Sequence, residues 1–564
     1  MTTNMINYLR YALYALLIFI GMQLYQAWDK EHAKPETTAA LSTTAIPDNN
    51  YVPTVTNTEQ TTATTNYAPT VGATSTAVPA AVNLIHVKTD VMDVGISAVG
   101  GDIDQVSLLK YPEELHSDKP FLLLNNSPDT RYIAQSGLLS KEGPDLAKGQ
   151  AVYQFEQNDY TLDPSQNDLQ VKLHWQNAEG LKVTKTFNFK RNSYEVDVAY
   201  QIENHSTAEW EGNLYLQLMR KNTPPVNAKG FVSLATYFGA AISSADKPFQ
   251  KINFKEMLTN NLNQSITGGW AAMVQHYFVS AWVPEETSKS DYFSKVTNDG
   301  LYTIGMIGPK ITAAPGATVT TRAKFYAGPS IADNLAVVSP KLPLTIDYGV
   351  ISLIAIVIFW MMQKIHSVVG NWGWSIVLVT LVIKLLFYQL SAKSYRSMNA
   401  LKRLQPRINQ LKEQFGDDKT KFTQATIDLY KKEKVNPMSG CLPILVQIPV
   451  FFALYWVLIE SVQLRQAPWI LWIHDLTQKD PFYVLPVLMG ISMFLQQRLS
   501  PPPPDPMQAK VMLFMPVVFT ALFLSFPAGL MLYWFVNNTL SFLQQWYIMH
   551  KMSAADAKPK KFKK

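Results

Sequence analysis

The chain has 564 residues, 47% of them hydrophobic, with a formal net charge of +6. Its single cysteine, Cys441, excludes an intrachain disulfide and a thiolate metal cluster, and its nine histidines form no HExxH-type pair. No GxxxxGK[ST] loop is present, so the sequence predicts no nucleotide, metal or other cofactor and no catalytic residue.

The first 80 residues form two predicted segments. Residues 1–28 contain an apolar run close to the ~20 residues that span a bilayer, with no small-x-small cleavage site after it. We expect an N-terminal transmembrane signal anchor, and a cleaved signal peptide is the alternative. Residues 29–80 are expected to be a disordered Thr/Ala/Pro-rich tether, because 36–80 contain 14 threonines and no Lys or Arg.

Residues 81–346 show the period-two pattern of β-strands. Tyr194, Val196, Val198, Tyr200 and Ile202 alternate with polar residues, and so do Leu214, Leu216 and Leu218. Such alternation places one set of side chains in a core and the other set in water. Runs of this kind between Gly-, Asn-, Asp- and Pro-rich turns predict a large antiparallel β-sandwich.

The last third of the chain is apolar and helical in pattern. Five membrane helices are predicted at about 373–391, 441–461, 482–499, 511–527 and 529–549, with a tight turn at Phe526–Gly529 between the last two. A shorter apolar stretch, 348–362, precedes them within 347–370. We expect it to be an interfacial amphipathic helix on the membrane surface. The alternative, that it spans, would invert every later orientation.

Charge sets the predicted orientation. Residues 393–440 carry 11 Lys/Arg against 5 Asp/Glu, and the tail 550–564 carries 6 Lys against one Asp. Residues 29–346 have 25 basic and 32 acidic residues. Short basic segments stay in the cytoplasm during insertion. Both termini are therefore expected in the cytoplasm, and the sandwich outside, in a bacterial periplasm.

One charged residue, Lys384, stands inside the run "SIVLVTLVIKLLFYQL" (375–390). On a continuous helix it lies roughly 14–15 Å from both Trp374 and Lys393, near the middle of the membrane. A charge there costs ~2.5–3.5 kcal/mol. Snorkelling serves lysines near helix ends, and Lys384 is central. Glu460 is the only carboxylate in the predicted membrane segments, and it lies near the outer end of its own segment, at the wrong depth for an ion pair with Lys384.

Water is the remaining way to accommodate this charge. Thr380, Lys384 and Tyr388 are spaced i, i+4, i+8 and form one polar stripe on a continuous helix. The predicted topology places more polar residues at mid-depth or in the cytoplasmic half: Gln447, Gln496, Gln497, Asn537, Asn538, Gln544 and Gln545. We predict a hydrated groove that is closed outside and open to the cytoplasm. Four of these residues could instead lie at the interface between lipid and water: Gln496, Gln497, Gln544 and Gln545.

The cytoplasmic segment 393–440 is predicted to be a basic helical hairpin. Leu401, Leu404, Ile408, Leu411 and Phe415 follow the spacing of a coiled-coil seam, and "GDD" at 416–418 interrupts the helix. Basic surfaces favour nucleic acid or anionic lipid. We expect contact with ribosomal RNA or with membrane lipids, and none with DNA.

Several stretches resemble the YidC/Oxa-type membrane protein insertases. They are "GNWGWSIVLVTLVIKLLFYQLSAKSYRSM", "VNPMSGCLPILVQIPVFFALYWVL", "LRQAPWILWIHDL", "DPFYVLPVLMG" and "FMPVVFTALFLSFPAGLMLYWFVNN". The resemblance covers roughly 345–550, and the external domain with its amino-terminal anchor resembles the Gram-negative YidC form.

The resemblance implies a polytopic α-helical protein of the bacterial inner membrane, with a five-helix insertase core (371–549) and a periplasmic β-supersandwich. It implies insertion and folding of nascent membrane proteins, without enzymatic activity, through the groove. The implied partners are the ribosome, the Sec translocon, SecDF and the signal recognition particle pathway.

The resemblance also bears on the site residues. Lys384 stands where the family usually has arginine, and Thr380 matches a neighbouring groove threonine. Tyr533 and Trp534 stand where many members have two tyrosines, so the family's aromatic client contact is carried over only loosely.

A secondary transporter and an anchored β-sandwich are the two alternative functions. A secondary transporter with Lys384 as an anion or proton site would show internal repeats with broken helices, and the sequence shows no repeat. A carbohydrate-binding or enzymatic sandwich anchored by the helices is the other alternative. Five polar-striped helices exceed what an anchor needs.

Overall fold

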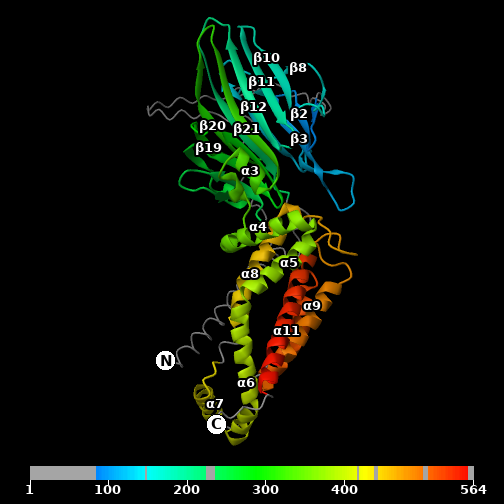
Figure 1. Cartoon of the computed structure of the whole chain (residues 1–564). Helices are drawn as coiled ribbons and strands as arrows, with labels where there is room; N and C mark the ends of the chain where they lie inside the picture. Colours follow the sequence, from blue (N-terminus) through cyan, green and yellow to red (C-terminus); the bar gives the residue numbers. More distant parts are fainter. Residues whose placement is uncertain are drawn as a thin grey trace, which may run out of the picture. The chain divides into compact units, whose positions relative to one another are not determined.

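The structure is a computed structural model that describes residues 84–146, 149–223, 236–415, 418–436, 442–499 and 506–556. The expected signal anchor (1–28), the expected tether (29–80) and residues 557–564 of the expected basic tail lie outside them. The described residues form a β-rich part followed along the chain by a helical part (Figure 1).

Two sheets make up the β-rich part. Along the 12-stranded sheet the strands are β16 (Asn263–Thr267), β19 (Lys289–Val296), β20 (Leu301–Ala313), β13 (Trp210–Lys221), β5 (Tyr132–Ser140), β3 (Ile103–Pro112), β2 (Met92–Ser97), β1 (Leu84–Lys88) and β9 (Asp159–Thr161). Off this path, β4 (Pro120–Leu124) pairs with β3, and β6 (Asp145–Leu146) pairs with β5 and β7 (Gly149–Gln150).

The order of the nine-stranded sheet is β15 (Gln250–Ile252), β14 (Gly239–Ser243), β17 (Trp270–Gln275), β18 (Phe278–Pro284), β21 (Thr318–Pro329), β12 (Glu195–Asn204), β11 (Leu181–Lys190), β10 (Asp168–Gln176) and β8 (Gln154–Phe155). Its long strands, β21, β12, β11 and β10, lie side by side (Figure 1). All its ladders are antiparallel. In the other sheet, β1–β9 and β5–β6 are parallel.

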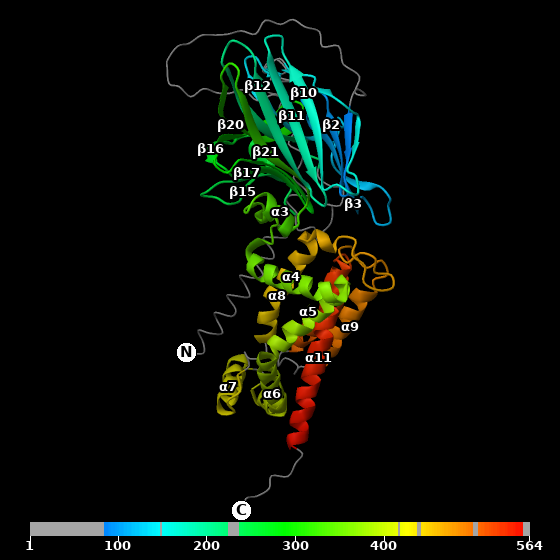
Figure 2. The same cartoon turned by 45° about the horizontal axis from the view of Figure 1, so that its top comes forward.

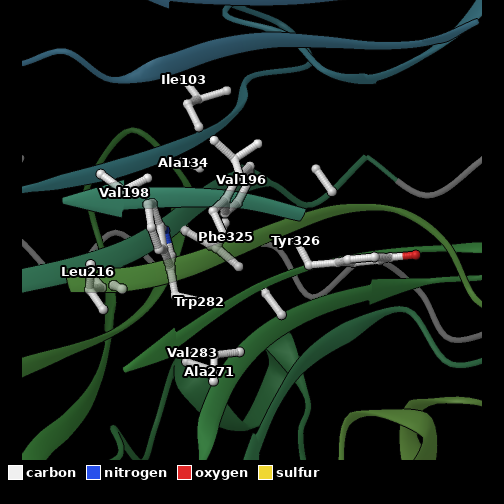
Figure 3. Packing of buried hydrophobic residues seen from close by; sticks show 14 of the residues in the cluster. Ile103, Ala134, Val196, Val198, Leu216, Ala271, Trp282, Val283, Phe325 and Tyr326 are labelled. Carbon is white, nitrogen blue, oxygen red and sulfur yellow. The ribbon is translucent and has the colours of Figure 1, made fainter. Parts of the chain in front are cut away.

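The core lies between the two sheets, as the alternating pattern predicts. The five apolar residues of 194–202 are all buried in one cluster, which also contains Leu214, Leu216 and Leu218. Figure 3 shows members of this cluster from both sheets: Ile103, Ala134 and Leu216 from the first, and Val196, Val198, Ala271, Trp282, Val283, Phe325 and Tyr326 from the second. The antiparallel β-sandwich is confirmed.

The prediction that the alternate residues of β13 face water is wrong. Tyr215, Gln217 and Met219 are buried as well. β13 is a central strand, and side chains of neighbouring segments cover its second face: Gln150 of β7 donates to the Tyr215 hydroxyl (3.0 Å), and Gln217 donates to the Gln135 amide oxygen (2.7 Å). Alternation marks the core face correctly, but it does not reveal a covered outer face.

The helical elements of the described residues follow. The β-rich part contains α2 (Phe254–Met257) and α3 (Ala332–Val338), and short 3-10 turns cover Leu342–Thr345, Gly349–Ile351 and Val462–Leu464. The longer helices are α4 (Ser352–Val369), α5 (Trp372–Leu386), α6 (Tyr388–Phe415), α7 (Lys419–Lys432), α8 (Leu442–Glu460), α9 (Val484–Leu499), α10 (Pro506–Phe523) and α11 (Ala528–Asp556). α11 packs along both α5 and α9 (Figures 1 and 2).

Helices cover all five predicted membrane segments, but the first of these segments is not one straight helix. α5 ends at Leu386, and α6 continues at an angle of 68°. The estimate of equal distances from Lys384 to Trp374 and Lys393 assumed a straight helix and is therefore wrong. The bend follows no proline or glycine, because the run Leu385–Gln389 contains neither.

By length and hydropathy, one helix of the described residues, Gly349–Val369, is able to cross a membrane, and the bent pair α5–α6 qualifies when both helices are counted together. Leu445–Glu460, Val484–Leu499 and Ala509–Phe523 are shorter apolar helices. The stretch 348–362 is thus the first part of a longer helix than the sequence indicates. α4 ends at Val369, and the next residue, Gly370, has a φ of 71°, which favours glycine.

α6 and α7 form the predicted helical hairpin (Figure 2). Leu404 and Ile408 of the predicted seam are buried, and the other three seam residues are half-buried. Asp418 caps α7 by accepting the backbone N–H groups of Thr420 and Lys421, both at 3.1 Å. An ion pair between Arg407 and Glu433 adds a second link between the two arms.

Candidate functional site

The Lys384 ammonium is held against α11. Lys384 lies in the last turn of α5, and its Nζ donates to the Ser541 hydroxyl at 2.6 Å. Ser541 is 2% exposed, and its own hydroxyl donates to the Asn537 carbonyl at 2.7 Å. No charged group of the described residues pairs with Lys384. The site therefore contains a half-buried cation whose neighbouring polar groups are neutral.

The other two residues of the predicted stripe lie differently. Thr380 is buried, and its hydroxyl donates to the Ile376 carbonyl of its own helix at 2.6 Å. Tyr388 lies beyond the break, at the start of α6, with its side chain 41% exposed. A single stripe of three residues on one helix is therefore wrong, because α5 ends before its third member.

α11 carries four buried polar residues. They are Asn537, Asn538, Ser541 and Gln545, and Ser541 lies four residues after Asn537 and four before Gln545. Asn538 donates to the Ser492 hydroxyl of α9 at 3.3 Å, and that hydroxyl donates to the Met489 carbonyl. These bonds join α11 to α9 on one side, while Ser541 joins α11 to α5 on the other.

Sequence reasoning missed Ser541 and Ser492. The signal for Ser541 was its position four residues after Asn537, on the same helix face. Gln544, which the sequence placed near the groove, donates to the Tyr388 carbonyl at 3.3 Å. Gln447 is half-buried on α8.

Tyr533 and Trp534 belong to an aromatic cluster rather than to the polar face. The Trp534 ring centroid lies 4.6 Å from that of Phe451 on α8 and 4.8 Å from that of Phe523 on α10. Phe519 lies 6.2 Å from Trp534, and Tyr533, which is buried, lies 6.5 Å from Phe451. Three of these residues, Phe451, Phe519 and Phe523, were not predicted from the sequence. The cluster joins α8, α10 and α11 about 10 Å from Ser541, counted as seven residues of helix rise.

A second polar cluster lies in the β-rich part, and sequence reasoning missed it. Lys185 of β11 is fully buried, and its Nζ donates to the carbonyls of Gly100 (3.1 Å), in the turn between β2 and β3, and of Ser136 (2.8 Å), in β5 of the other sheet. The rings of Phe187 and Tyr200 lie 5.3 and 5.2 Å from the same nitrogen. The sequence signal for a buried lysine was its place in "LKVTKTFNFK", where Lys185 alternates in step with the apolar residues of the inward face.

Two buried carboxylates accompany Lys185. Asp102 accepts from the side chains of Gln135 (2.6 Å) and Gln150 (3.0 Å), and Asp145 accepts from the Leu138 backbone N–H (2.7 Å). Burial raises the pKa of Asp102 to about 6 and that of Asp145 to about 7, although the nearby Lys185 charge opposes both shifts. Burial lowers the pKa of Lys185 to about 8, against the attraction of both acids.

Comparison with known proteins settles the family. Residues 84–361 match the YidC periplasmic domain, and residues 364–556 match the 60Kd inner membrane protein family. A membrane protein insertase YidC from Pseudomonas putida is 47% identical over 556 residues, which cover 97% of this chain and 99% of that protein. The chain belongs to the YidC family of membrane protein insertases.

Two other Pseudomonas proteins support this assignment. The one from Pseudomonas entomophila is 49% identical over 490 residues, or 87% of each chain, and one from Pseudomonas fluorescens is 46% identical over 558 residues, or 97% and 99%. A solved structure described as an active YidC insertase with its first transmembrane domain resolved aligns at 17% identity and a TM-score of 0.37, over 82% of this chain and 94% of that one.

The predicted family, its Gram-negative form and its function are confirmed. The chain is a membrane protein insertase of the inner membrane with a periplasmic β-domain and a helical membrane core, from a family without enzymatic activity. Its substrates are nascent membrane proteins.

Proposed function

We propose that this insertase holds the hydrophilic flank of a nascent membrane protein in a hydrated groove that opens to the cytoplasm. Lys384 and the polar face of α11 would line it. The observation that carries the proposal is the half-buried Lys384 ammonium, which is bonded to Ser541 and to no described carboxylate. A membrane cation that lacks an acidic partner is available to an anionic group of the client.

The apolar segment of the client is proposed to follow α8 and α10. Both helices expose large apolar side chains: Leu445, Ile448 and Phe452 on α8, and Val511, Leu513, Phe514, Val517 and Val518 on α10. About 20 apolar residues at roughly −0.3 to −0.6 kcal/mol each outweigh a modest polar flank when the segment enters lipid. The membrane potential adds ~2.3 kcal/mol per charge per 100 mV for a negative flank.

The partners and the orientation belong to the same proposal. The basic hairpin α6–α7 and the basic tail 550–564 favour a cytoplasmic position, so both termini are proposed to lie there. The hairpin would receive the ribosome and the signal recognition particle pathway, and its basic residues would contact anionic lipid. Action alone or together with the Sec translocon and SecDF is proposed from the family.

α4 is proposed to lie along the membrane surface within 347–370. It buries Ala355, Ile358 and Met362 on one face and exposes Leu353 and Trp360 on another. A helix that covers protein with one face and offers apolar side chains with the other suits the interface between lipid and water. A spanning α4 would place the basic hairpin on the other side of the membrane, against the charge distribution.

A cysteine at position 384 tests the groove. The natural Cys441 is first replaced by serine, and Lys384→Cys is then labelled with a membrane-impermeant maleimide from each side of the membrane. We expect labelling from the cytoplasmic side alone. Val382→Cys is the matched control, because Val382 is an exposed apolar residue of the same helix and its thiol would face lipid, where a thiolate does not form. Absence of labelling at 384, or labelling from outside only, contradicts the groove.

A further inference from the structure

The contact between Ser541 and Lys384 has a defined direction. The Ser541 hydroxyl hydrogen is donated to the Asn537 carbonyl, so its oxygen is left as an acceptor, and Lys384 Nζ donates to that oxygen. An ammonium has three N–H groups. Ser541 occupies one of them, and no other described group is hydrogen-bonded to Lys384 Nζ.

Without this contact, a second, outward rotamer is open to the Lys384 side chain. The neighbouring residues on the last turns of α5, Leu381, Val382, Leu385 and Leu386, expose apolar side chains. A lysine stem packs readily along such a surface while its amine moves toward the nearest water or headgroup. Four apolar neighbours therefore favour an outward rotamer, and the buried hydroxyl on α11 favours an inward one.

We propose that Ser541 is a positioning residue for the Lys384 ammonium, which it turns toward α11 so that the two remaining N–H groups meet a carboxylate in the flank of the client. This inference rests on the proposed function. It identifies acidic flanks as the client feature that depends on the pair. Ser541 does not contact the client directly and acts through Lys384.

The hydroxyl of Tyr395 supplies the matched control. Tyr395 is buried on α6 and also reaches the Ser541 side chain. Tyr395→Phe removes a contact to Ser541 but leaves the bond between Ser541 and Lys384 in place. A role of Ser541 in packing α6 against α11 would be disturbed by this change, whereas the positioning of Lys384 would not.

The test is a double-mutant cycle in the full-length protein, produced in cells depleted of their own insertase. Ser541→Ala and Ser541→Thr are each combined with Lys384 and with Lys384→Leu. Two clients that differ only in an acidic or a neutral flank are followed by protease protection. The readout is the ratio of their insertion rates, which a loss of protein or a general packing defect does not change.

We expect Ser541→Ala to lower the ratio of acidic to neutral client about tenfold, the fold-change of one charge-assisted hydrogen bond. Ser541→Thr should restore the ratio, because threonine keeps the hydroxyl and its bond to the carbonyl four residues before it. In the Lys384→Leu background, Ser541→Ala should change nothing further. Tyr395→Phe should retain the wild-type ratio.

Two results overturn the inference alone: an unchanged ratio in Ser541→Ala while Lys384→Leu lowers it, or an equal effect of Ser541→Ala with and without Lys384. A Tyr395→Phe protein that matches Ser541→Ala overturns it as well. If Lys384→Leu leaves the ratio unchanged, the proposed role of the cation in client binding fails, and the positioning role falls with it.

Discussion

Replacing Lys185 by methionine should destabilise the β-domain by an amount that depends on pH. Methionine keeps most of the apolar stem, but it removes the charge and both donors that bridge from β11 to Gly100 and Ser136. Removing one partner from a buried set of charges costs about 3–5 kcal/mol, because the remaining charges stay buried without compensation. We expect a loss of this size at about pH 8, where Asp102 and Asp145 are ionised.

The sign of the pH dependence follows from the two acids. Their pKa values in the folded protein, about 6 and about 7, are above the ordinary value near 4. The folded state therefore binds more protons than the unfolded state between about pH 4 and pH 7. The stability that these acids contribute is present at low pH and is lost as the pH rises through their folded-state pKa values.

Lys185 acts in the opposite direction at higher pH. Its folded-state pKa of about 8 lies below its ordinary value, so the wild-type domain regains stability between about pH 8 and pH 10.5. In Lys185→Met this recovery disappears. The loss that the acids cause at lower pH deepens, because no cation opposes their raised pKa values. At about pH 5, where both acids are protonated, the cost of Lys185→Met should fall to about 1–3 kcal/mol for the unpaired carbonyls.

Hydrogen–deuterium exchange of the full-length protein in detergent measures this cost. Peptides from β5 and β11 are followed at both pH values and corrected for intrinsic exchange. Asp145→Asn is the matched change, since its amide oxygen still accepts from the Leu138 N–H while one buried charge is removed. A protein that carries both Lys185→Met and Asp145→Asn should be less destabilised at pH 8 than one that carries Lys185→Met alone. An equal cost of Lys185→Met at pH 5 and pH 8 would refute the charge argument.

Three further predictions concern the membrane core and its loops. Lys384→Arg should preserve insertion, whereas Lys384→Leu should slow clients with acidic flanks about tenfold, the equivalent of about 1.4 kcal/mol; equal rates in a protease-protection assay would argue against a charge role. Deleting most of 81–346 should spare insertion of a small two-span client, because the core cluster of the sandwich takes a single buried residue, Val462, from the described helical part; complete loss of that insertion in depleted cells would contradict a modular design. Asp480→Ala should lower the free energy of unfolding by about 3 kcal/mol, because the buried Asp480 carboxylate accepts from Trp472 Nε1 and from the backbone N–H groups of Phe482 and Leu485. Asp480→Asn, which keeps an acceptor, should cost less in thermal unfolding, and equal melting temperatures for the two variants would show that these bonds contribute little.

Local sequence patterns predicted the strands and helices that bury one apolar face. The alternation of 194–202 located a core strand, and the spacing of Leu404 and Ile408 located the hairpin seam. The covered outer face of β13 escaped prediction, because its cover comes from Gln150 and other residues distant in sequence. Lys185 escaped for a related reason. A lysine in a strand suggests an exposed face until a tertiary partner shows otherwise.

The site was predicted in part. Lys384 was found from its charge alone, but its partner Ser541 lies 157 residues later and has no charge to mark it. The bend after Leu386 was not predictable from local sequence, since the residues there form helices readily and neither proline nor glycine is present. α5 packs on α4 and α11, and α6 packs on α7, α8 and α11. These neighbours are distant in sequence, so a local window does not contain them.

The bend after Leu386 affects how a force on the hairpin reaches Lys384. If α5 and α6 formed one straight helix of more than forty residues, a force on its cytoplasmic end would act directly on the position of Lys384. Because the chain bends one turn beyond the lysine, the axis of α6 departs from that of α5, and Lys384 contacts α11 before the bend. A force on the hairpin would therefore reach the lysine through the contacts of α6 with α11, such as that of Tyr395 with Ser541, rather than along one continuous helix axis.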